Sequence, residues 1–131
     1  MVILSLEHII KIVLAVILGS VIGVQRKSEG KPAGLRTYAI VCLGATLISI
    51  ISSEYFAGDP TRIAAGVITG VGFLGGGAII AAGGKVHGLT TAAGLWVMAA
   101  VGLTIGAGGY MLATVVTVIV MLVLTMGKEK R

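Results

Sequence analysis

A run of uncharged residues, residues 63–82, constrains the fold of this chain more than any other segment. At about 1.5 Å per residue, a helix of this length crosses a hydrocarbon core of about 30 Å. Six of its twenty residues are glycine, which makes a poor helix in water. Lipid offers the backbone no water, so a buried segment of this kind still forms a helix. The run therefore predicts a glycine-rich transmembrane helix.

The glycines of this run are spaced to leave flat strips for neighbouring helices. Gly66 and Gly70 are four residues apart, as are Gly72 and Gly76, and such pairs let helices approach closely in lipid. We therefore expect a central helix with neighbours on several sides and assign these four glycines to helix packing. A carbonyl-lined ion filter at residues 69–73 is a weaker interpretation, because its residue order differs and no pore helix precedes it.

The composition indicates an integral membrane protein. Hydrophobic residues make up 56% of the chain and charged residues 11%, whereas soluble domains carry about 25% charged residues. The formal charge of +5 does not predict a nucleic-acid partner, because the basic residues flank apolar segments and form no patch with aromatic residues. The single cysteine, Cys42, rules out a disulfide within the chain.

Five apolar segments predict an all-α fold, a single domain over residues 1–131 with five transmembrane helices. The expected spans are about 8–25, 35–53, 63–82, 89–105 and 110–126. We do not expect a signal peptide, because no basic region precedes the first segment and no small-x-small cleavage site follows it. Lys11 is expected to extend to the nearer interface. Trp96 falls mid-span and is expected to pack between helices.

The distribution of basic residues predicts the orientation in the membrane. Eight of the ten Lys and Arg residues lie on one predicted side, and Lys11 and Arg62 lie on the other. We therefore expect the N-terminus outside and the C-terminus in the cytoplasm.

A short motif occurs twice on the predicted cytoplasmic side. Residues 30–37 and 84–91 share the pattern Gly-Lys-x-x-Gly-Leu-x-Thr, which fits a parallel repeat of two helical hairpins. Each copy stands at the start of a helix, where free N–H groups favour an anion such as phosphate or a lipid headgroup. A capped turn with cytoplasmic lysines is the simpler interpretation. Neither copy has the spacing of a P-loop.

Four motifs in order carry a resemblance to a known family. They are Gly-Leu-Arg-Thr at 34–37, Asp-Pro-Thr-Arg-Ile-Ala-Ala at 59–65, Gly-Val-Gly-Phe-Leu-Gly-Gly-Gly at 70–77, and Gly-Leu-Thr-Thr-Ala-Ala with Leu-Trp at 88–96. The chain resembles the MgtC/SapB family of bacterial membrane proteins over nearly its whole length. The resemblance implies an inner-membrane location, a link to magnesium limitation and, in pathogens, virulence through survival inside host cells. It also implies action by modulation of other membrane proteins.

The chain departs from the family pattern in two places. The family often has an acidic residue where Gln25 stands. Many members also continue into a cytoplasmic domain, whereas this chain stops at Arg131, so we expect either that regulation by such a domain is absent or that the chain is a fragment.

Acidic and histidine residues offer little support for a metal site, and the metal ligands stay unknown. Glu54 and Asp59 share a predicted outer loop that could attract a hydrated cation. However, Asp59 before Pro60 is typical of a helix cap. His87 has no second ligand close in sequence, so we interpret it as a loop residue.

Polar residues within the family motifs form the candidate functional set. Arg36 and Arg62 are interpreted as members of a polar cluster or of ion pairs within the bundle, with interfacial anchoring as the alternative. The full set is Arg36, Thr37, Asp59, Arg62, Thr69, Thr90 and Thr91. No nucleophile stands beside a base, so we expect neither an enzyme nor a cofactor.

Two functions follow as hypotheses. The first is a protein of magnesium homeostasis that contacts membrane lipids and modulates a partner membrane complex. Its protein partner is expected to be another membrane protein, further copies of this chain in a homo-oligomer, or both. The alternative is a homo-oligomeric transporter or channel for Mg²⁺ or another cation. A continuous polar cavity at the bilayer midplane would favour transport, and a dry core would favour modulation.

Overall fold

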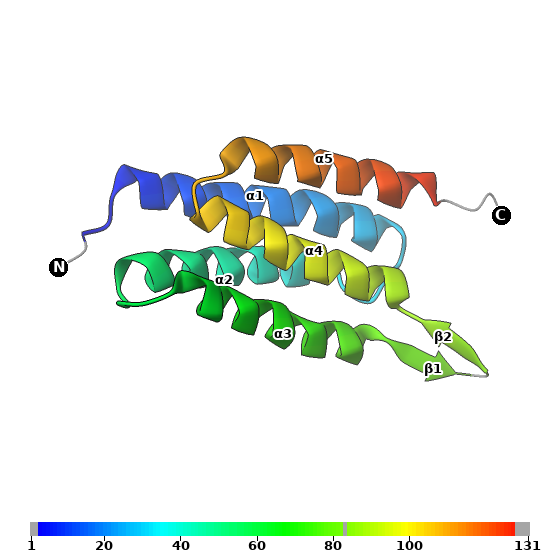
Figure 1. Cartoon of the computed structure of the whole chain (residues 1–131). Coiled ribbons are helices and arrows are strands. Elements are labelled where there is room, and N and C mark those ends of the chain that lie inside the picture. The colour runs from blue at the N-terminus through cyan, green and yellow to red at the C-terminus, as the bar shows by residue number, and fades with distance from the viewer. Residues whose placement is uncertain (1–2, 83, 128–131) are drawn as a thin grey trace.

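The computed structural model describes residues 3–82 and 84–127, which form five helices and one two-stranded hairpin (Figure 1). The elements in chain order are α1 (Leu6–Ser28), α2 (Leu35–Glu54), α3 (Pro60–Ala78), β1 (Ile80–Ala82), β2 (Lys85–His87), α4 (Leu89–Gly106) and α5 (Tyr110–Met126). Successive helices run in opposite directions (Figure 1). We call the end that carries β1 and β2 the hairpin end, and the end where α1 begins the N-terminal end.

The expectation of a helical membrane protein is confirmed, whereas the count of five spans is not. Three of the described helices, α1, α2 and α4, are long and apolar enough to cross a membrane. The apolar helix α5 has 17 residues. The glycines of α3 and the polar residues of its first turn dilute its apolar content, and α3 is not among the three.

The central helix of the bundle is α4, not α3 as the glycine pattern predicts. Helix α4 contacts each of the other four helices. In contrast, α3 buries only Val71 and Gly75 among its described residues. The reason is that small residues on α1 and α4 make the close contacts with α2, which leaves α3 beside α2 and α4 on the outside of the bundle.

Glycines on α1 and α4 let these helices approach the backbone of α2. A Cβ atom added at Gly19 would lie 2.6 Å from the carbonyl oxygen of Tyr38, and one at Gly23 would lie 2.5 Å from the Cα of Leu35. On the other side of α2, a Cβ atom at Gly102 would overlap the carbonyl oxygen of Cys42. Such close approach is typical of helices in lipid, where van der Waals contact drives association.

Hydroxyl groups of α2 reinforce its contact with α4. The Oη of Tyr38 donates to the carbonyl of Thr91 at 3.2 Å, the Oγ1 of Thr46 to Gly102 at 3.0 Å, and the Oγ of Ser49 to Leu103 at 3.1 Å. Because an unbonded hydroxyl is costly in an apolar interior, these bonds fix the register of the two helices.

The third helix is shorter than the predicted span 63–82, and the predicted loop 83–88 contains a strand. Helix α3 ends at Ala78, and the next residue, Ile79, is extended with φ −87° and ψ 122°. Three consecutive glycines before Ala78 weaken the helix there. β1 then pairs antiparallel with β2, with Ile80 opposite His87.

Gly88 closes the hairpin onto α4 in a conformation that suits glycine. Its φ is +91°, a value that side chains with a Cβ rarely adopt. A Cβ atom there would also overlap the carbonyl oxygen of Ala78. Gly88 therefore lets the chain turn sharply from the end of α3, through the hairpin, into α4.

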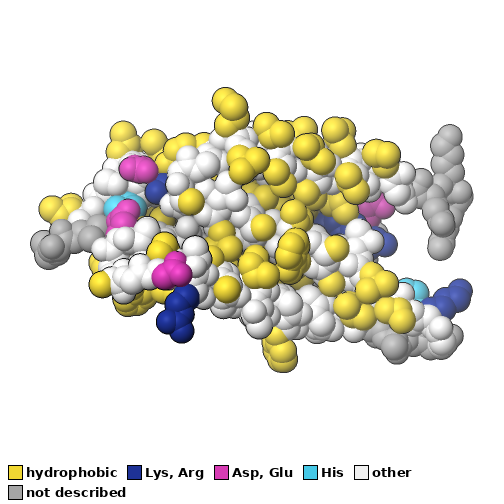
Figure 2. Space-filling model, viewed as in Figure 1, with side chains coloured by type: hydrophobic (Ala, Val, Ile, Leu, Met, Phe, Trp, Pro, Cys, Tyr) yellow, Lys and Arg dark blue, Asp and Glu magenta, His cyan; other side chains and the backbone are white. Residues whose placement is uncertain are grey.

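The core of the bundle is apolar, and apolar side chains also cover its middle. Ile22, Tyr38, Cys42, Met98 and Ile105 are fully buried. In the view of Figure 2, hydrophobic side chains cover the middle of the bundle and charged side chains gather towards its two ends. Trp96 is 49% exposed within the chain, so the expected packing between helices is wrong here, and this ring lies on the outer surface with the other apolar side chains.

Candidate functional site

A buried polar cluster joins three helices at the hairpin end. Arg26, in the last turn of α1, is only 3% exposed. Its Nη2 donates to the Oγ1 of Thr91 at 3.1 Å. Thr91 is also buried, in the first turn of α4, and its carbonyl accepts the bond from Tyr38 of α2. The guanidinium of Arg26 is therefore held where α1, α2 and α4 meet.

Part of this cluster has no hydrogen-bond partner among the described residues. The unpartnered atoms are the Nε of Arg26 and both amide atoms of Gln25. Neither of the two ion pairs in the described part of the chain includes Arg26. A buried cation without a counter-ion is costly, so Arg26 is a group for which an anionic partner would be favourable.

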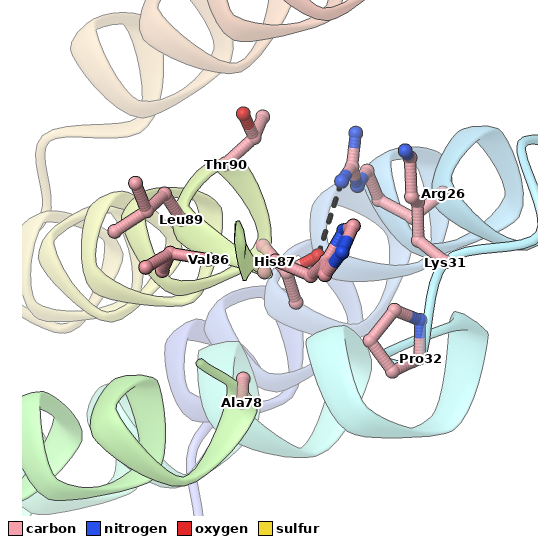
Figure 3. Close-up of a pocket in the computed structure, with 10 residues that line it drawn as sticks. Arg26, Lys31, Pro32, Ala78, Val86, His87, Leu89 and Thr90 are labelled. Carbon is pink, nitrogen blue, oxygen red and sulfur yellow. Dashed lines mark hydrogen bonds between the residues drawn. The ribbon is translucent and has the colours of Figure 1, made fainter. Parts of the chain in front are cut away.

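A pocket of about 370 Å³ opens beside Arg26. Figure 3 shows Arg26, Lys31 and His87 with their nitrogen-bearing ends on the same side of it. The lining residues are Arg26, Lys31, Pro32, Ala78, Val86, His87, Gly88, Leu89, Thr90 and Thr91. None of these residues is acidic, so the pocket has a positive electrostatic character.

The start of α4 adds free backbone donors to this pocket. Its N-cap is Gly88, which offers no side chain to cap the helix. The N–H of Ala92 donates to the carbonyl of Gly88 at 2.9 Å. In an α-helix the amides before this one, those of Leu89, Thr90 and Thr91, have no intrahelical acceptor. The positive end of the helix dipole therefore faces the same region as Arg26.

A second polar cluster lies at the N-terminal end. The Nε2 of His8 lies 2.7 Å from the Oε2 of Glu54, which links the start of α1 to the end of α2. The Nδ1 of the same ring accepts from the backbone N–H of Ser5 at 3.0 Å, as part of a capping box. Glu54 thus pairs with a histidine rather than joining Asp59 in a cation-attracting loop.

Lys11 lies within the bundle rather than reaching the interface freely. It is 6% exposed, and its Nζ lies 3.2 Å from the Oε1 of Glu7. It lines a second pocket, of about 420 Å³, together with Ser49, Ser52, Ser53, Pro60, Thr61, Ala64, Leu103, Gly106 and Ala107. This pocket is also without an acidic lining residue.

An apolar barrier separates the two pockets along α1. Ala15, Leu18 and Ile22 lie between Lys11 and Arg26 on this helix, and all three are buried.

Within residues 3–82 and 84–127, no group of three or more His, Cys, Asp and Glu side chains could hold a metal ion.

The residues of the predicted functional set do not form one cluster, because they divide between the two ends of the bundle. Thr91 is the member that is buried, and Arg26 bonds to it. Thr90 and Thr91 belong to the hairpin end, whereas Asp59 and Arg62 belong to the N-terminal end. The exposed members are Arg36, Thr37, Asp59, Arg62, Thr69 and Thr90.

Asp59 caps α3, as its position before Pro60 predicts. Its Oδ1 accepts from the backbone N–H of Thr61 at 2.9 Å and from the Oγ1 of Thr61 at 2.6 Å. These bonds lower the pKa of the Asp59 carboxyl from its ordinary value of 3.8.

The four glycines assigned to helix packing face open space within this chain. A Cβ atom added at Gly66, Gly70, Gly72 or Gly76 would meet no atom within 4 Å. Gly70 also lines an apolar groove between α2 and α3, of about 370 Å³. Any packing role of these glycines therefore requires a second molecule.

Sequence reasoning did not identify Arg26, Gln25, Lys11 or His8 as site residues. A signal was present, because His8, Lys11 and Arg26 lie on one helical stripe with Ala15 and other small or apolar residues, all of which are buried. A helix shows this three-to-four-residue spacing when one face is packed. Polar residues on such a stripe are expected to be buried with it.

Comparison with known proteins places the chain among bacterial membrane proteins. A family model described as the MgtC family matches residues 12–131. A protein of Escherichia coli strain K12, named YhiD and described as a proposed magnesium transporter, is 44% identical over 130 residues, which cover 92% of this chain and 60% of that protein. No solved structure matches.

Two further relatives support the same assignment. Protein MgtC of Salmonella typhimurium strain LT2 is 39% identical over 118 residues, covering 90% of this chain and 51% of the relative. An uncharacterized protein of Haemophilus influenzae is 40% identical over 129 residues, covering 88% of this chain and 54% of the relative. The chain spans between about half and 60% of the length of these relatives.

Proposed function

Because this chain belongs to the MgtC family, we propose that it is an inner-membrane protein of adaptation to magnesium limitation that binds and modulates a partner membrane protein. Magnesium enters the proposal from the family and from the name of the relative YhiD. The apolar helices α1, α2 and α4 suit a multi-pass protein of the bacterial inner membrane. In this proposal the N-terminal end faces outwards and the hairpin end faces the cytoplasm.

The charged side chains at the two pockets favour modulation over magnesium transport. Mg²⁺ requires oxygen ligands, usually one or two carboxylates with several waters. Each pocket instead contains a buried cationic side chain, Arg26 at one end and Lys11 at the other, and no carboxylate lines either pocket. A divalent cation would be repelled by Arg26 at the hairpin end. At the other end Glu7 already pairs with Lys11, and buried apolar side chains of α1 lie between the two pockets.

The open face of α3 supplies a surface for the partner. Gly66, Gly70, Gly72 and Gly76 leave the backbone of α3 accessible. The neighbouring side chain of Phe73 is 85% exposed. A partner helix can approach closely at such a face, with Phe73 as an apolar anchor.

Flux and growth measurements together test this proposal. Liposomes that contain only this protein are expected to take up Mg²⁺ no faster than empty liposomes. In cells limited for magnesium, Gly70→Leu is expected to remove the contribution of the protein to growth, because the leucine blocks close helix contact. Thr114→Leu, at an exposed position of α5, is the matched control and is expected to grow like the wild type.

Capture of the partner completes the test. A photoreactive residue at position 73 is expected to cross-link a membrane protein in magnesium-limited cells, and Gly70→Leu is expected to abolish this product. Gly70→Leu cells that grow normally, with the cross-link retained, would refute the partner surface.

A homo-oligomeric transporter is the second candidate, favoured by the presence of polar pockets at both ends of the bundle. In an oligomer, pockets of adjacent copies could join into a path. Mg²⁺ or other cation flux into the liposomes would establish this function in place of modulation, provided that Lys11→Met or Arg26→Met changes the rate.

A further inference from the structure

We propose that the pocket at the hairpin end binds a phosphate group, presented either by free phosphate or by the headgroup of a phospholipid. The structure joins four kinds of donor there: the guanidinium of Arg26, the amine of Lys31, the hydroxyls of Thr90 and Thr91, and the free amides at the start of α4. This inference is independent of the proposed partner function.

The buried guanidinium is the observation that points to a ligand. Arg26 is 97% buried, lines the pocket, and has an Nε without a partner in the described part of the chain. Its Nη2 donates to the neutral hydroxyl of Thr91, and the phenol of Tyr38 also interacts with this guanidinium. A phosphate oxygen would satisfy the Nε of Arg26, and the phosphate would neutralise the buried charge. Arg binds phosphate with planar, directed hydrogen bonds.

The start of α4 supplies the second half of the site. Gly88 brings the chain into the helix without a capping side chain, so the first amides of α4 have no intrahelical acceptor. Such amides and the positive end of the helix dipole bind phosphate in many proteins. The residues that carry these amides, Leu89, Thr90 and Thr91, line the same pocket as Arg26 and Lys31, and Figure 3 labels Leu89 and Thr90 among them.

The loop before α2 positions the remaining cation. The backbone N–H of Lys31 donates to the carbonyl of Arg26 at 3.1 Å, which folds the loop back over the end of α1. The side chain of Lys31 is exposed but lines the pocket. It can therefore reach a bound phosphate from the solvent side, while Arg26 holds the phosphate from the buried side.

The dimensions and location of the pocket fit a phosphate with the group that carries it. A volume of about 370 Å³ leaves room beyond the phosphate itself. Exposed apolar side chains, Val86 and Leu89, lie among the lining residues and could contact a glycerol or acyl segment. Because charged loops and apolar helices meet at this end of the bundle, a lipid headgroup would reach the pocket from the membrane surface.

Titration of the purified protein in neutral detergent with inorganic phosphate, at constant ionic strength, tests the site for free phosphate. Phosphate is expected to raise the melting temperature, and Lys31→Gln is expected to weaken the apparent affinity about tenfold, as for the loss of one charge-assisted contact. Arg26→Gln is expected to abolish binding. Because Lys31 is exposed, its variant is expected to fold even if Arg26→Gln does not.

Lys85→Gln is the matched control. Lys85 belongs to β2, close in sequence to the pocket, but does not line it. The Lys85→Gln variant loses the same charge as Lys31→Gln. It is expected to keep the affinity of the wild type within about twofold, since an exposed charge outside the pocket lining is screened by solvent and salt. Equal losses of phosphate affinity in Lys31→Gln and Lys85→Gln would overturn the proposal, because they would show that phosphate is attracted by surface charge alone.

Nanodiscs distinguish the two sources of phosphate. The protein is placed in phosphatidylcholine nanodiscs with or without phosphatidic acid, and lipid retention is measured by native mass spectrometry. If the protein retains phosphatidic acid, if Lys31→Gln weakens this retention, and if inorganic phosphate does not bind, the ligand is a lipid. Binding of inorganic phosphate that Lys31→Gln weakens assigns free phosphate. Binding of neither probe overturns the proposal.

Discussion

At the scale of single residues, this chain buries polar atoms that have no hydrogen-bond partner among the described residues. Both amide atoms of Gln25 are buried and unbonded among the described residues. Methionine has a similar volume and length and no polar atoms to satisfy, so Gln25→Met is expected to stabilise the protein by about 1 kcal/mol, the lower end of the cost of an unsatisfied buried group. Unfolding in mixed micelles measures the change.

Val24→Met is the control for this substitution. Val24 is 54% exposed on the same turn of α1, and its replacement is expected to leave the stability unchanged. A loss of stability in Gln25→Met would contradict the assignment and would mean that the amide makes bonds in the native protein.

For the pair of His8 and Glu54, we predict that substitution lowers the stability of the protein. His8 is 8% exposed, and its Nε2 contacts Glu54 at 2.7 Å. Glu54→Ala leaves the buried ring without this partner and is expected to cost about 1–3 kcal/mol. Ser53→Ala is the control, because among the described residues the hydroxyl of this exposed serine donates to carbonyls of its own helix, those of Ser49 and Ile50. Equal effects of the two substitutions on unfolding would refute a stabilising role of the pair.

At the scale of elements, the same glycine substitution is expected to have opposite signs on two helices. A methyl group at Gly102 of α4 would overlap the backbone of Cys42, so Gly102→Ala is expected to cost about 1–3 kcal/mol. Gly66 of α3 faces open space, so Gly66→Ala is expected to stabilise its helix by up to about 1 kcal/mol. Unfolding of the monomeric protein measures both, and equal signs would contradict the assignment of α4 to the centre.

The start of α3 gives a pH dependence. Because hydrogen bonds from Thr61 lower the pKa of Asp59, the folded helix favours the carboxylate. The stabilisation by this cap is fully present above the ordinary pKa of 3.8 and is lost as the pH falls through the lowered folded pKa. Amide hydrogen exchange at the start of α3, relative to intrinsic rates, is expected to accelerate on such acidification.

Asp59→Ala is the reference for this pH dependence. It removes the cap at every pH, so exchange at the start of α3 is expected to be faster than in the wild type at neutral pH and to lack the acid-dependent step. A wild-type step that persists in Asp59→Ala would assign the titration to another group.

The existence of the helices could be predicted from the sequence, but their arrangement could not. Long uncharged segments determine helices in lipid, so four of the five predicted ranges lie close to α1, α2, α4 and α5. Spacing of small residues identifies a flat face but not the helix that covers it. Gly19 and Gly23 contact α2, whereas a Cβ atom added at Gly66 or Gly70, with the same spacing, would meet no other described element within 4 Å.

The candidate site was predictable only in part, for a related reason. The motif at residues 84–91 correctly marks a helix start, and Gly88 and Thr91 belong to it, whereas an anion at this start stays a prediction. Arg26 precedes a polar loop, and in the sequence it resembles an ordinary cytoplasmic charge. Its burial depends on the contact of α1 with α4, which brings it to Thr91 across 65 positions of the chain.

At the scale of the whole molecule, the basic residues predict one orientation in the membrane. Among the described residues, Arg26, Lys27, Lys31, Arg36 and Lys85 belong to the hairpin end, and Lys11 and Arg62 to the N-terminal end. Cytoplasmic loops carry the excess of Lys and Arg, so the hairpin end is expected to face the cytoplasm.

Cysteine labelling tests this orientation, because the native Cys42 is fully buried and the unsubstituted chain is expected to stay unlabelled. In spheroplasts of intact inner membrane, a membrane-impermeant maleimide is expected to label Arg62→Cys and to label Lys85→Cys only after the membrane is opened. The reverse pattern would place the phosphate pocket on the outer face, where it could not meet cytoplasmic phosphate. Labelling of both variants in closed membranes would mean that the two ends of the bundle do not lie on opposite sides, and that the described helices do not span the membrane as one unit.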